Sequence, residues 1–277
     1  MGHVPNIDLT TDVAIPQLGF GVFQVPPAET KEAVATALRV GYRSIDTAAI
    51  YGNERQVGEA IAESGIARDE LFITTKLWNS EQGYDTTLAA FDASMEKLGL
   101  EQLDLYLIHW PVPERDHYLD TWRAFEKLHA DGRVRAIGVS NFTEEHLQRL
   151  MDSADVKPAI NQVELHPRFQ QSKLRAFHAE HGIATEAWGP LGQGTLLDHP
   201  VLSKIAEKHG RSTAQVMIRW HLQIGNVVIP KSVTPARIEQ NFAVFDFELD
   251  GEDLDAIASL DDENGRIGPD PTTFNVV

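Results

Sequence analysis

The sequence contains no cysteine, and this absence excludes disulfide bonds, thiolate metal sites and redox-active thiols. Any chemistry must therefore come from other side chains or from a bound cofactor. Long apolar segments are also missing. No run reaches the ~18 residues of a transmembrane helix, and the first residues lack both the basic flank and the apolar stretch of a signal peptide. We therefore expect a cytoplasmic protein that has no membrane partner.

Positive charge is scarce as well. The 277 residues include 24 lysines and arginines but 41 aspartates and glutamates, which gives a formal net charge of -17. Because attraction to nucleic-acid phosphates needs a basic surface, this charge argues against a nucleic-acid partner. A polyanionic ligand would need a local basic pocket.

The chain shows no low-complexity linker and no sequence repeat, so we expect a single domain over residues 1–277. What recurs is a pattern in which a short apolar or β-branched run, a polar loop and an amphipathic helix follow one another. The expected strands lie at 16–20, 43–45, 71–75, 103–108, 134–139, 159–163, 183–187 and 227–230. The expected helices lie at 29–40, 53–63, 86–97, 121–130, 172–181, 200–209 and 252–259, with further helices opened by Thr143, Ser212 and Thr234.

This alternation is typical of parallel strands with right-handed crossovers, either closed into a barrel or left as an open sheet. Polar residues favour the barrel, because they lie where the expected strands end, and in a barrel those ends converge on one mouth. They are Asp46, Lys76, His109, Ser140, Asn141, Gln162, Trp188 and Lys231. We therefore predict an α/β fold, a (β/α)8 TIM barrel with two additional helices and a short N-terminal hairpin that closes the barrel bottom.

Asp46, Tyr51, Lys76 and His109 lie at or just after the ends of three adjacent expected strands. Singly, each has a structural explanation, such as a surface ion pair, a loop tyrosine or a buried histidine. Together they suit proton donation to a carbonyl oxygen while hydride reaches its carbon. A free tyrosine has a pKa of about 10, and the ammonium of Lys76 would lower the pKa of Tyr51. Asp46 would hold Lys76 charged, and His109 would orient the carbonyl.

Motifs along nearly the whole chain match one family in the family's order. They are GFGVF at 19–23, IDTAAIYGNE at 45–54, TTKLWN at 74–79, LYLIHWP at 105–111, IGVSNF at 137–142, NQVELHP at 161–167, WGPLGQG at 188–194 and IPKSV at 229–233. With these motifs the sequence resembles the aldo-keto reductases, whose catalytic set falls on the four residues above without a substitution. Trp188 with GPLGQG, and VFDFEL at 244–249, are similar to the bacterial 2,5-diketo-D-gluconate reductase branch.

The resemblance implies an enzyme that uses NADPH to reduce an aldehyde, ketone or diketo acid, with Tyr51 as general acid. One candidate substrate is 2,5-diketo-D-gluconate, and another small carbonyl such as methylglyoxal is an alternative. A second class of function stays open, because similar barrels serve as cofactor-sensing, non-catalytic subunits of membrane channels. The expected protein is a monomer whose partner is a small-molecule carbonyl.

The resemblance also assigns residues that bind NADPH or NADP+. Trp188 would stack on the nicotinamide, where many relatives have tyrosine, and Arg237 would suit the 2′-phosphate. Read without the family, Lys231 and Arg237 are solvated charges beside a helix. The full cofactor set is Gly21, Val22, Asp46, Ser140, Asn141, Gln162, Trp188, Gly189, Leu191, Gly192, Gln193, Gly194, Lys231, Ser232, Val233, Arg237, Gln240 and Asn241. The substrate-lining set is Phe23, Tyr51, Trp78, His109 and Trp110.

No metal site is expected. His178 and His181 lie three residues apart on an expected helix, but no carboxylate-rich motif accompanies them, so we interpret them as exposed histidines. Substrate specificity is expected to depend on the segments 110–118, 188–198 and 264–277.

Overall fold

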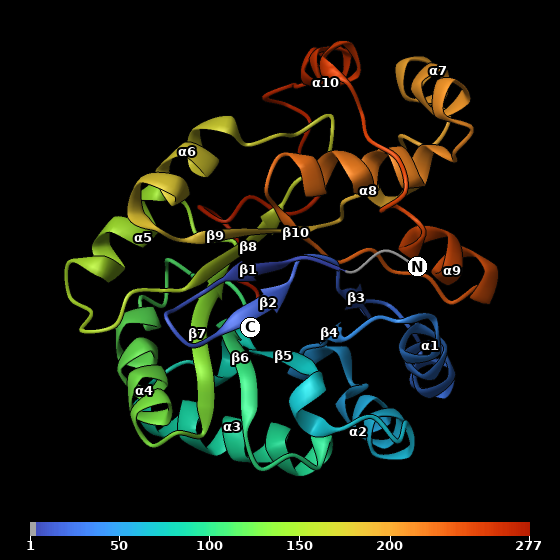
Figure 1. Cartoon of the computed structure of the whole chain (residues 1–277). Helices are drawn as coiled ribbons and strands as arrows, with labels where there is room; N and C mark the ends of the chain where they lie inside the picture. Colours follow the sequence, from blue (N-terminus) through green and yellow to red (C-terminus); the bar gives the residue numbers. More distant parts are fainter. Residues whose placement is uncertain (1–3) are drawn as a thin grey trace.

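Eight parallel strands form the centre of the protein (Figure 1). The computed structural model describes residues 4–277. In sheet order the strands are β10 (Val227–Val228), β9 (Ala184–Trp188), β8 (Ile160–Glu164), β7 (Val134–Ser140), β6 (Leu103–Ile108), β5 (Phe72–Leu77), β4 (Ser44–Asp46) and β3 (Phe20–Gly21). Every neighbouring pair is parallel, and a bridge between Leu18 and Val228 joins the two edges. The predicted (β/α)8 barrel is therefore confirmed.

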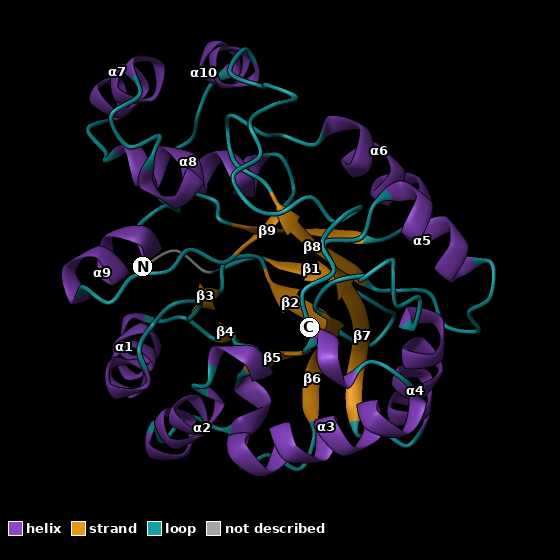
Figure 2. Cartoon of the chain, turned by 180° about the vertical axis from the view of Figure 1, so that it is seen from behind, coloured by secondary structure: helices purple, strands orange, loops and turns teal. Residues whose placement is uncertain are grey.

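Helices cover the outside of the barrel (Figure 2). They are α1 (Pro27–Val40), α2 (Glu54–Glu63), α3 (Tyr84–Leu98), α4 (Tyr118–Ala130), α5 (Glu144–Met151), α6 (Ser172–His181), α7 (Pro200–His209), α8 (Thr213–Gln223), α9 (Pro235–Phe242) and α10 (Gly251–Ala258). In this order α7 and α10 are the two helices beyond the regular alternation, as predicted. Within the described residues, no helix has the length and apolar character needed to cross a membrane.

Local sequence explains where several helices begin. Thr143 accepts a hydrogen bond from a backbone N–H in the first turn of α5, and Ser212 and Gln215 form the reciprocal bonds of a capping box before α8. Both expected starts are confirmed. The helix expected from Asn53 has Asn53 as its N-cap and Glu54 as its first helical residue; the Asn53 backbone oxygen accepts from Val57 N–H at 3.1 Å, while its side chain bonds to another loop.

The N-terminal hairpin is formed by β1 (Asn6–Asp8) and β2 (Ala14–Pro16), which pair antiparallel and lie across the end of the barrel (Figure 1). Its apolar side chains Leu9, Val13 and Ile15 are buried against the first residues of the barrel strands. The hairpin therefore closes the barrel bottom, as predicted.

The first barrel strand, expected at 16–20, starts later than expected. Pro16 belongs to the hairpin, where its missing N–H is tolerated at an edge, and the chain enters the barrel only at Leu18. The Gln17 side chain fixes this crossover by donating to the carbonyl oxygens of Leu222 (2.8 Å) and Asn226 (3.0 Å).

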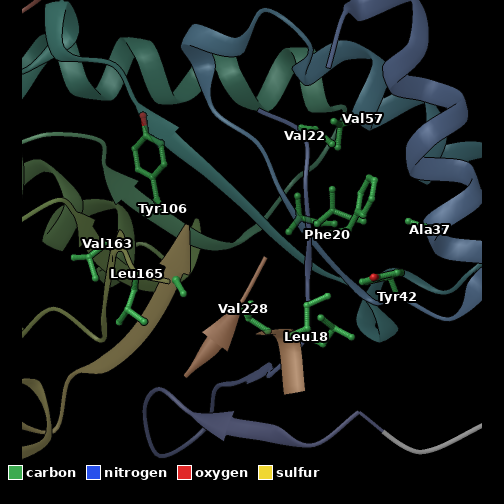
Figure 3. Close-up of a cluster of buried hydrophobic side chains, with 14 of the residues drawn as sticks. Leu18, Phe20, Val22, Ala37, Tyr42, Val57, Tyr106, Val163, Leu165 and Val228 are labelled. Atoms are coloured by element: carbon green, nitrogen blue, oxygen red, sulfur yellow. The ribbon is translucent and has the colours of Figure 1, made fainter. Parts of the chain in front are cut away.

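The barrel wall is buried on both faces. Every residue of β5 and β6 is buried, because helices cover the outside and side chains fill the inside. Leu18, Phe20 and Val228 belong to the large apolar cluster that runs between strands and helices (Figure 3). Full burial of such a side chain contributes about 1.5–3 kcal/mol. Polar side chains in this interior need partners, and they gather at the carboxyl ends of the strands.

Candidate active site

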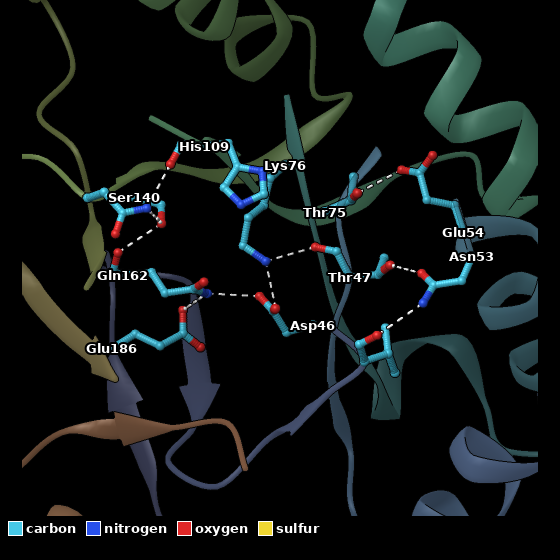
Figure 4. Close-up of polar contacts among 12 residues, drawn as sticks. Asp46, Thr47, Asn53, Glu54, Thr75, Lys76, His109, Ser140, Gln162 and Glu186 are labelled. Carbon is cyan, nitrogen blue, oxygen red and sulfur yellow. Dashed lines mark hydrogen bonds and ion pairs between the residues drawn. The ribbon is translucent and has the colours of Figure 1, made fainter. Parts of the chain in front are cut away.

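Asp46 and Lys76 form an ion pair inside the carboxyl end of the barrel (Figure 4). Asp46 ends β4 and Lys76 lies on neighbouring β5. The Lys76 Nζ atom is 2.6 Å from Asp46 Oδ1 and 2.9 Å from the carbonyl oxygen of Thr47. The two side chains are 4% and 0% exposed, so each charge depends on the other. Burial alone lowers the pKa of Lys76, but neighbouring groups, Asp46 first, raise it above its usual value overall, so Lys76 is a cation at neutral pH.

Tyr51 lies beside this pair, on the short helix η1 (Ala49–Tyr51) that follows β4. Its ring centre is 5.2 Å from Lys76 Nζ and 5.8 Å from the ring centre of His109. Burial raises the pKa of Tyr51 above its ordinary value, and Lys76 acts in the opposite direction. Overall the pKa of Tyr51 is raised, because burial has a larger effect than Lys76. The expectation that Lys76 brings this pKa below that of free tyrosine is therefore wrong. The phenol is therefore protonated at neutral pH.

His109 directly follows β6 and is 8% exposed. Burial, and then the charge of Lys76, hold the pKa of His109 well below its usual value, so the imidazole is neutral at pH 7. The Trp78 ring packs edge-on against it at 5.3 Å, and Asn141 Nδ2 donates to its backbone oxygen at 3.0 Å. A neutral imidazole can donate a hydrogen bond to a carbonyl oxygen. The four expected catalytic residues thus lie together.

Aromatic side chains lie beside Tyr51 and beside the C-terminal residues. Phe23, which is 50% exposed, packs 5.1 Å from the Tyr51 ring, and Trp110 packs 4.4 Å from Phe274. Asn53 positions the loop that carries Phe23 by donating from Nδ2 to two carbonyl oxygens of that loop at 3.1 and 3.3 Å. Of the expected substrate-lining residues, Phe23 therefore contacts Tyr51, Trp78 contacts His109, and Trp110 contacts Phe274 near the C-terminus.

Hydrogen bonds join the residues expected around the nicotinamide. Ser140 Oγ donates to the carbonyl oxygen of Gln162 at 2.8 Å, and Asn141 Nδ2 donates to Ser140 Oγ at 3.1 Å. Trp188 Nε1 donates to Asn141 Oδ1 at 2.8 Å. The bonds connect the ends of β7, β8 and β9. They hold the indole of Trp188 in one orientation beside fixed amide groups.

The other expected cofactor residues come from three segments. Gly189, Gly192 and Gly194 have positive φ, which glycine adopts without steric cost, and Gln193 between them also has a positive φ of 52°, so this loop turns tightly after β9. Gly21 and Val22 end the first barrel strand, where their N–H groups donate to the carbonyl oxygens of Pro230 (3.2 Å) and Asp46 (3.1 Å). Leu191 is half-buried in the tight loop after β9. The remaining expected residues lie between β10 and α9 or on α9. The buried ones are Ser232 and Asn241, and the exposed ones are Lys231, Val233, Arg237 and Gln240.

Lys231 and Arg237 are the expected phosphate ligands. Across residues 4–277, neither side chain forms an ion pair with a carboxylate. Two exposed cations without acidic partners in a protein of net charge -17 are suited to an anionic ligand.

The Aldo/keto reductase family model matches residues 17–262. The chain belongs to this family. An aldo-keto reductase of Mycobacterium sp. (strain JLS) is 60% identical over 98% of each chain, and the glyoxal reductase of Bacillus subtilis (strain 168) is 56% identical over 96% of each. The crystal structure of a Gox0644 mutant in complex with NADPH matches with a TM-score of 0.95 at 50% identity, over 99% of both chains. The family resemblance of the sequence is confirmed.

Sequence reasoning missed two buried carboxylates of this aldo/keto reductase. Glu186 on β9 accepts a hydrogen bond from Gln162 Nε2 at 2.9 Å, and the same nitrogen donates to Asp46 Oδ2 at 2.9 Å. Glu164, at the end of β8, accepts from His166 Nε2 at 3.0 Å. It also accepts from the backbone N–H groups of Ile267 and Gly268, at 2.6 and 2.8 Å, in the C-terminal segment formed by residues 264–277. For Glu186 the available signal was a carboxylate inside the strand expected at 183–187, because a buried carboxylate requires a partner; Glu164 lies one residue beyond the strand expected at 159–163 and gave no such signal.

The C-terminal segment of the reductase is hydrogen-bonded to residues at the carboxyl ends of two barrel strands. Near Gly268 the segment bonds to Glu164, and its backbone lies so close to Trp188 that an added Cβ would come within 2.5 Å of the indole. Further along, Asn79 Nδ2 donates to the carbonyl oxygen of Val276 at 2.7 Å. The segment therefore lies against Trp188, which ends β9, and against Asn79, which lies just after β5.

The interpretation of His178 as an exposed histidine is wrong. It is fully buried, accepts from Asn161 Nδ2 at 3.0 Å, and places Nδ1 2.9 Å from Thr185 Oγ1, so it joins α6 to β8 and β9. His181 is half-buried and stacks on Phe177. In the part of the chain that the structure describes, no three potential metal ligands gather as a candidate site.

Proposed function

We propose that this aldo/keto reductase converts the carbonyl group of a small aldehyde, ketone or diketo acid to the alcohol, with NADPH as hydride donor and Tyr51 as proton donor. The observation that carries the proposal is the buried Asp46–Lys76 ion pair beside a protonated phenol, with a neutral His109 on the other side. A cation fixed beside a phenol lowers the cost of the phenolate that remains after proton donation.

The residues present fit NADPH at both ends. Trp188 offers an aromatic face held by Asn141, and Lys231 and Arg237 offer two unpaired cations for a phosphate group. A guanidinium can form two parallel charge-assisted hydrogen bonds to phosphate. When bound, NADPH supplies hydride to the carbonyl carbon of the substrate. The NADPH complex of the related Gox0644 mutant supports this assignment.

The protein's own residues orient the carbonyl oxygen and protonate it. His109 donates a hydrogen bond that orients the oxygen, and Tyr51 Oη transfers its proton to it as negative charge develops there. Lys76 stabilises the resulting phenolate at short range inside a dry site. Asp46 keeps the Lys76 ammonium charged and in place through the 2.6 Å contact.

The favoured substrate class is a small uncharged carbonyl such as glyoxal or methylglyoxal. Phe23, Trp78 and Trp110 give the opening an aromatic lining, and the net charge of -17 repels an acid at long range. The likeness to a glyoxal reductase supports the same class. Comparison of turnover with an anionic substrate, such as 2,5-diketo-D-gluconate, tests this preference for uncharged carbonyls. We also propose that the enzyme acts as a cytoplasmic monomer, for which size-exclusion chromatography should give about its 30.8 kDa mass.

The test is NADPH oxidation with a panel of neutral and anionic carbonyls. Wild-type protein should turn over the neutral carbonyls. Tyr51→Phe should lose at least about one hundredfold in kcat while NADPH affinity, followed by fluorescence titration, changes less than about twofold. If wild-type protein binds NADPH but oxidises it with no carbonyl of the panel, the enzyme assignment is wrong and a cofactor-sensing role is favoured.

A further inference from the structure

Glu186 is a buried carboxyl group inside the barrel that the mechanism above does not use. It lies on β9 in register with Gln162 on β8 and Val227 on β10, and it is 1% exposed. Figure 4 shows the chain of contacts that leads from Glu186 through Gln162 and Asp46 to Lys76. Because β8 and β4 are four strands apart in an eight-stranded barrel, this chain crosses the interior beneath the mouth.

The amide of Gln162 has one orientation in this chain of contacts. Its Nε2 atom lies 2.9 Å from Asp46 Oδ2 and 2.9 Å from Glu186 Oε2, and because the Asp46 carboxylate can only accept hydrogen bonds, the atom between the two oxygens must be the donor nitrogen. Both Nε2 hydrogens are therefore used. The amide oxygen is the group of Gln162 that remains for a ligand, so Asp46 and Glu186 together fix which end of this side chain faces away from the two carboxyl groups.

The charge state of Glu186 affects the same site. The titratable groups that face it are Asp46 from β4, Lys76 from β5 and Tyr51 from η1, while β10 places the apolar Val227 beside it. Burial, and then the charge of Asp46, raise the pKa of Glu186 to about 8. At neutral pH the carboxyl is thus mainly neutral, and Asp46 and Lys76 balance each other. Ionisation of Glu186 would add a negative charge that raises the pKa of Tyr51.

We propose that Glu186 is a positioning residue of the reduction, which orients Gln162 and keeps an uncharged carboxyl group beneath Tyr51 while that residue gives up its proton. The inference rests on the proposed function. A neutral Glu186 lets Lys76 stabilise the phenolate without opposition. An ionised Glu186 opposes it, so proton transfer slows as the pH rises through about 8.

The kinetic test is single-turnover oxidation of bound NADPH by glyoxal between pH 6 and 9.5. In wild-type protein the rate should fall severalfold around pH 8. Glu186→Gln keeps the volume and an acceptor for Gln162 but cannot ionise, so its rate at pH 7 should stay within about threefold of wild type and the fall near pH 8 should disappear. Glu180→Gln, which removes a carboxylate from the exposed face of α6, should retain the fall.

Glu186→Leu separates orientation from charge, because leucine neither ionises nor accepts a hydrogen bond. Its rate should be at least about tenfold below that of Glu186→Gln at every pH. Persistence of the fall near pH 8 in Glu186→Gln would overturn the role of the charge. Equal rates for the leucine and glutamine variants would overturn the role in orienting Gln162. Absence of turnover in wild-type protein would contradict the proposed function instead.

A second readout needs neither NADPH nor substrate. The ordinary pKa of a glutamate is near 4.3, and that of Glu186 in the folded protein is about 8. Between these two pH values the folded protein keeps the proton on Glu186, whereas the unfolded chain has released it. The folded protein therefore loses stability as the pH rises through this window. Glu186→Gln removes this loss. Its urea midpoint should exceed that of Glu180→Gln by more at pH 8 than at pH 5, and an equal difference at both values would overturn the buried neutral carboxyl.

Discussion

Lys76 is the residue on which both chemistry and stability of the site depend. Its side chain is 0% exposed, and its loss would leave Asp46 buried with only the amide of Gln162 as partner. Removing one member of a buried ion pair costs about 3–5 kcal/mol, a large part of a typical folding free energy of about 5–15 kcal/mol. We therefore expect Lys76→Met to lower both kcat and the urea midpoint of unfolding.

The matched control is the double variant Asp46→Asn with Lys76→Met, in which no unpaired charge remains. Its urea midpoint should return most of the way to wild type while turnover stays at the level of Lys76→Met. Recovery of turnover in the double variant would contradict the role of Lys76 in stabilising the phenolate. Failure to recover stability would show that the size of the lysine side chain matters more than its charge.

At the scale of elements, His178 makes the attachment of α6 to the barrel sensitive to acid. Burial lowers the pKa of His178 to about 4, from an ordinary value near 6.5. Between these values the unfolded chain binds a proton there and the folded protein does not, so stability falls as pH drops, by about 1.4 kcal/mol per pH unit for this residue. His178→Gln can make similar hydrogen bonds to Asn161 and Thr185 without titrating.

Urea unfolding at pH 7 and pH 5 measures this contribution. His178→Gln should lose less stability on acidification than wild type does. The same substitution at the exposed His117 is the control and should lose as much as wild type. An acid response of His178→Gln equal to that of the His117 variant would contradict the assignment of a buried neutral imidazole to this position.

We expect the C-terminal residues 264–277 to act in substrate binding more than in folding. Phe274 packs on Trp110, and Asn79 holds the carbonyl oxygen of Val276. An aromatic pair contributes about 0.5–1.5 kcal/mol, or about 2- to 12-fold in affinity. Removal of residues 270–277 should therefore raise KM for a small aldehyde by about that factor and change kcat less than about twofold.

Steady-state kinetics and thermal unfolding together test this expectation. Phe274→Ala should reproduce part of the KM change, since it removes the ring and keeps the backbone. The thermal midpoint should change little in both variants, because the segment covers the mouth and not the main apolar cluster. A collapse of kcat at unchanged KM would instead show that the segment holds Trp188 or the catalytic residues in place.

The whole molecule is strongly acidic, and this makes the local cations decisive for cofactor choice. NADPH differs from NADH by the 2′-phosphate, which the net charge of -17 repels at long range. Charge-assisted hydrogen bonds contribute about 1.5–3 kcal/mol each. We therefore expect Arg237→Ala to weaken NADPH binding by about 10- to 100-fold, while NADH binding stays nearly unchanged.

Dissociation constants for both cofactors, at low and high salt, measure the effect. High salt should narrow the NADPH preference of wild-type protein, because contacts of the exposed Arg237 are screened. Lys231→Ala should give a smaller loss, since an ammonium lacks the two-pronged geometry of a guanidinium. Equal losses for NADPH and NADH in Arg237→Ala would show that this residue supports another part of the cofactor or the fold.

Local patterns in the sequence predicted the elements well wherever strand and helix alternate. Thr143 and Ser212 cap helices as their types suggest, and the strand at 103–108 has the expected bounds. The predicted element bounds are wrong where a residue bonds to or pairs with a residue that is distant in the sequence. Pro16 ends a hairpin that closes the barrel bottom, and the side chain of Asn53 bonds to another loop instead of capping the helix that Asn53 precedes. Neither partner is close in sequence, so no local pattern reveals it.

The sequence by itself determined the barrel and the meeting of Asp46, Tyr51, Lys76 and His109, because the carboxyl ends of parallel barrel strands must converge. Tertiary structure alone decided the electrostatics of that meeting. Burial raises the pKa of the Tyr51 phenol further above neutrality, keeps the imidazole of His109 neutral, and raises the pKa of Glu186 to about 8. These properties depend on exclusion of water and on distances across the barrel, which residue order does not encode locally.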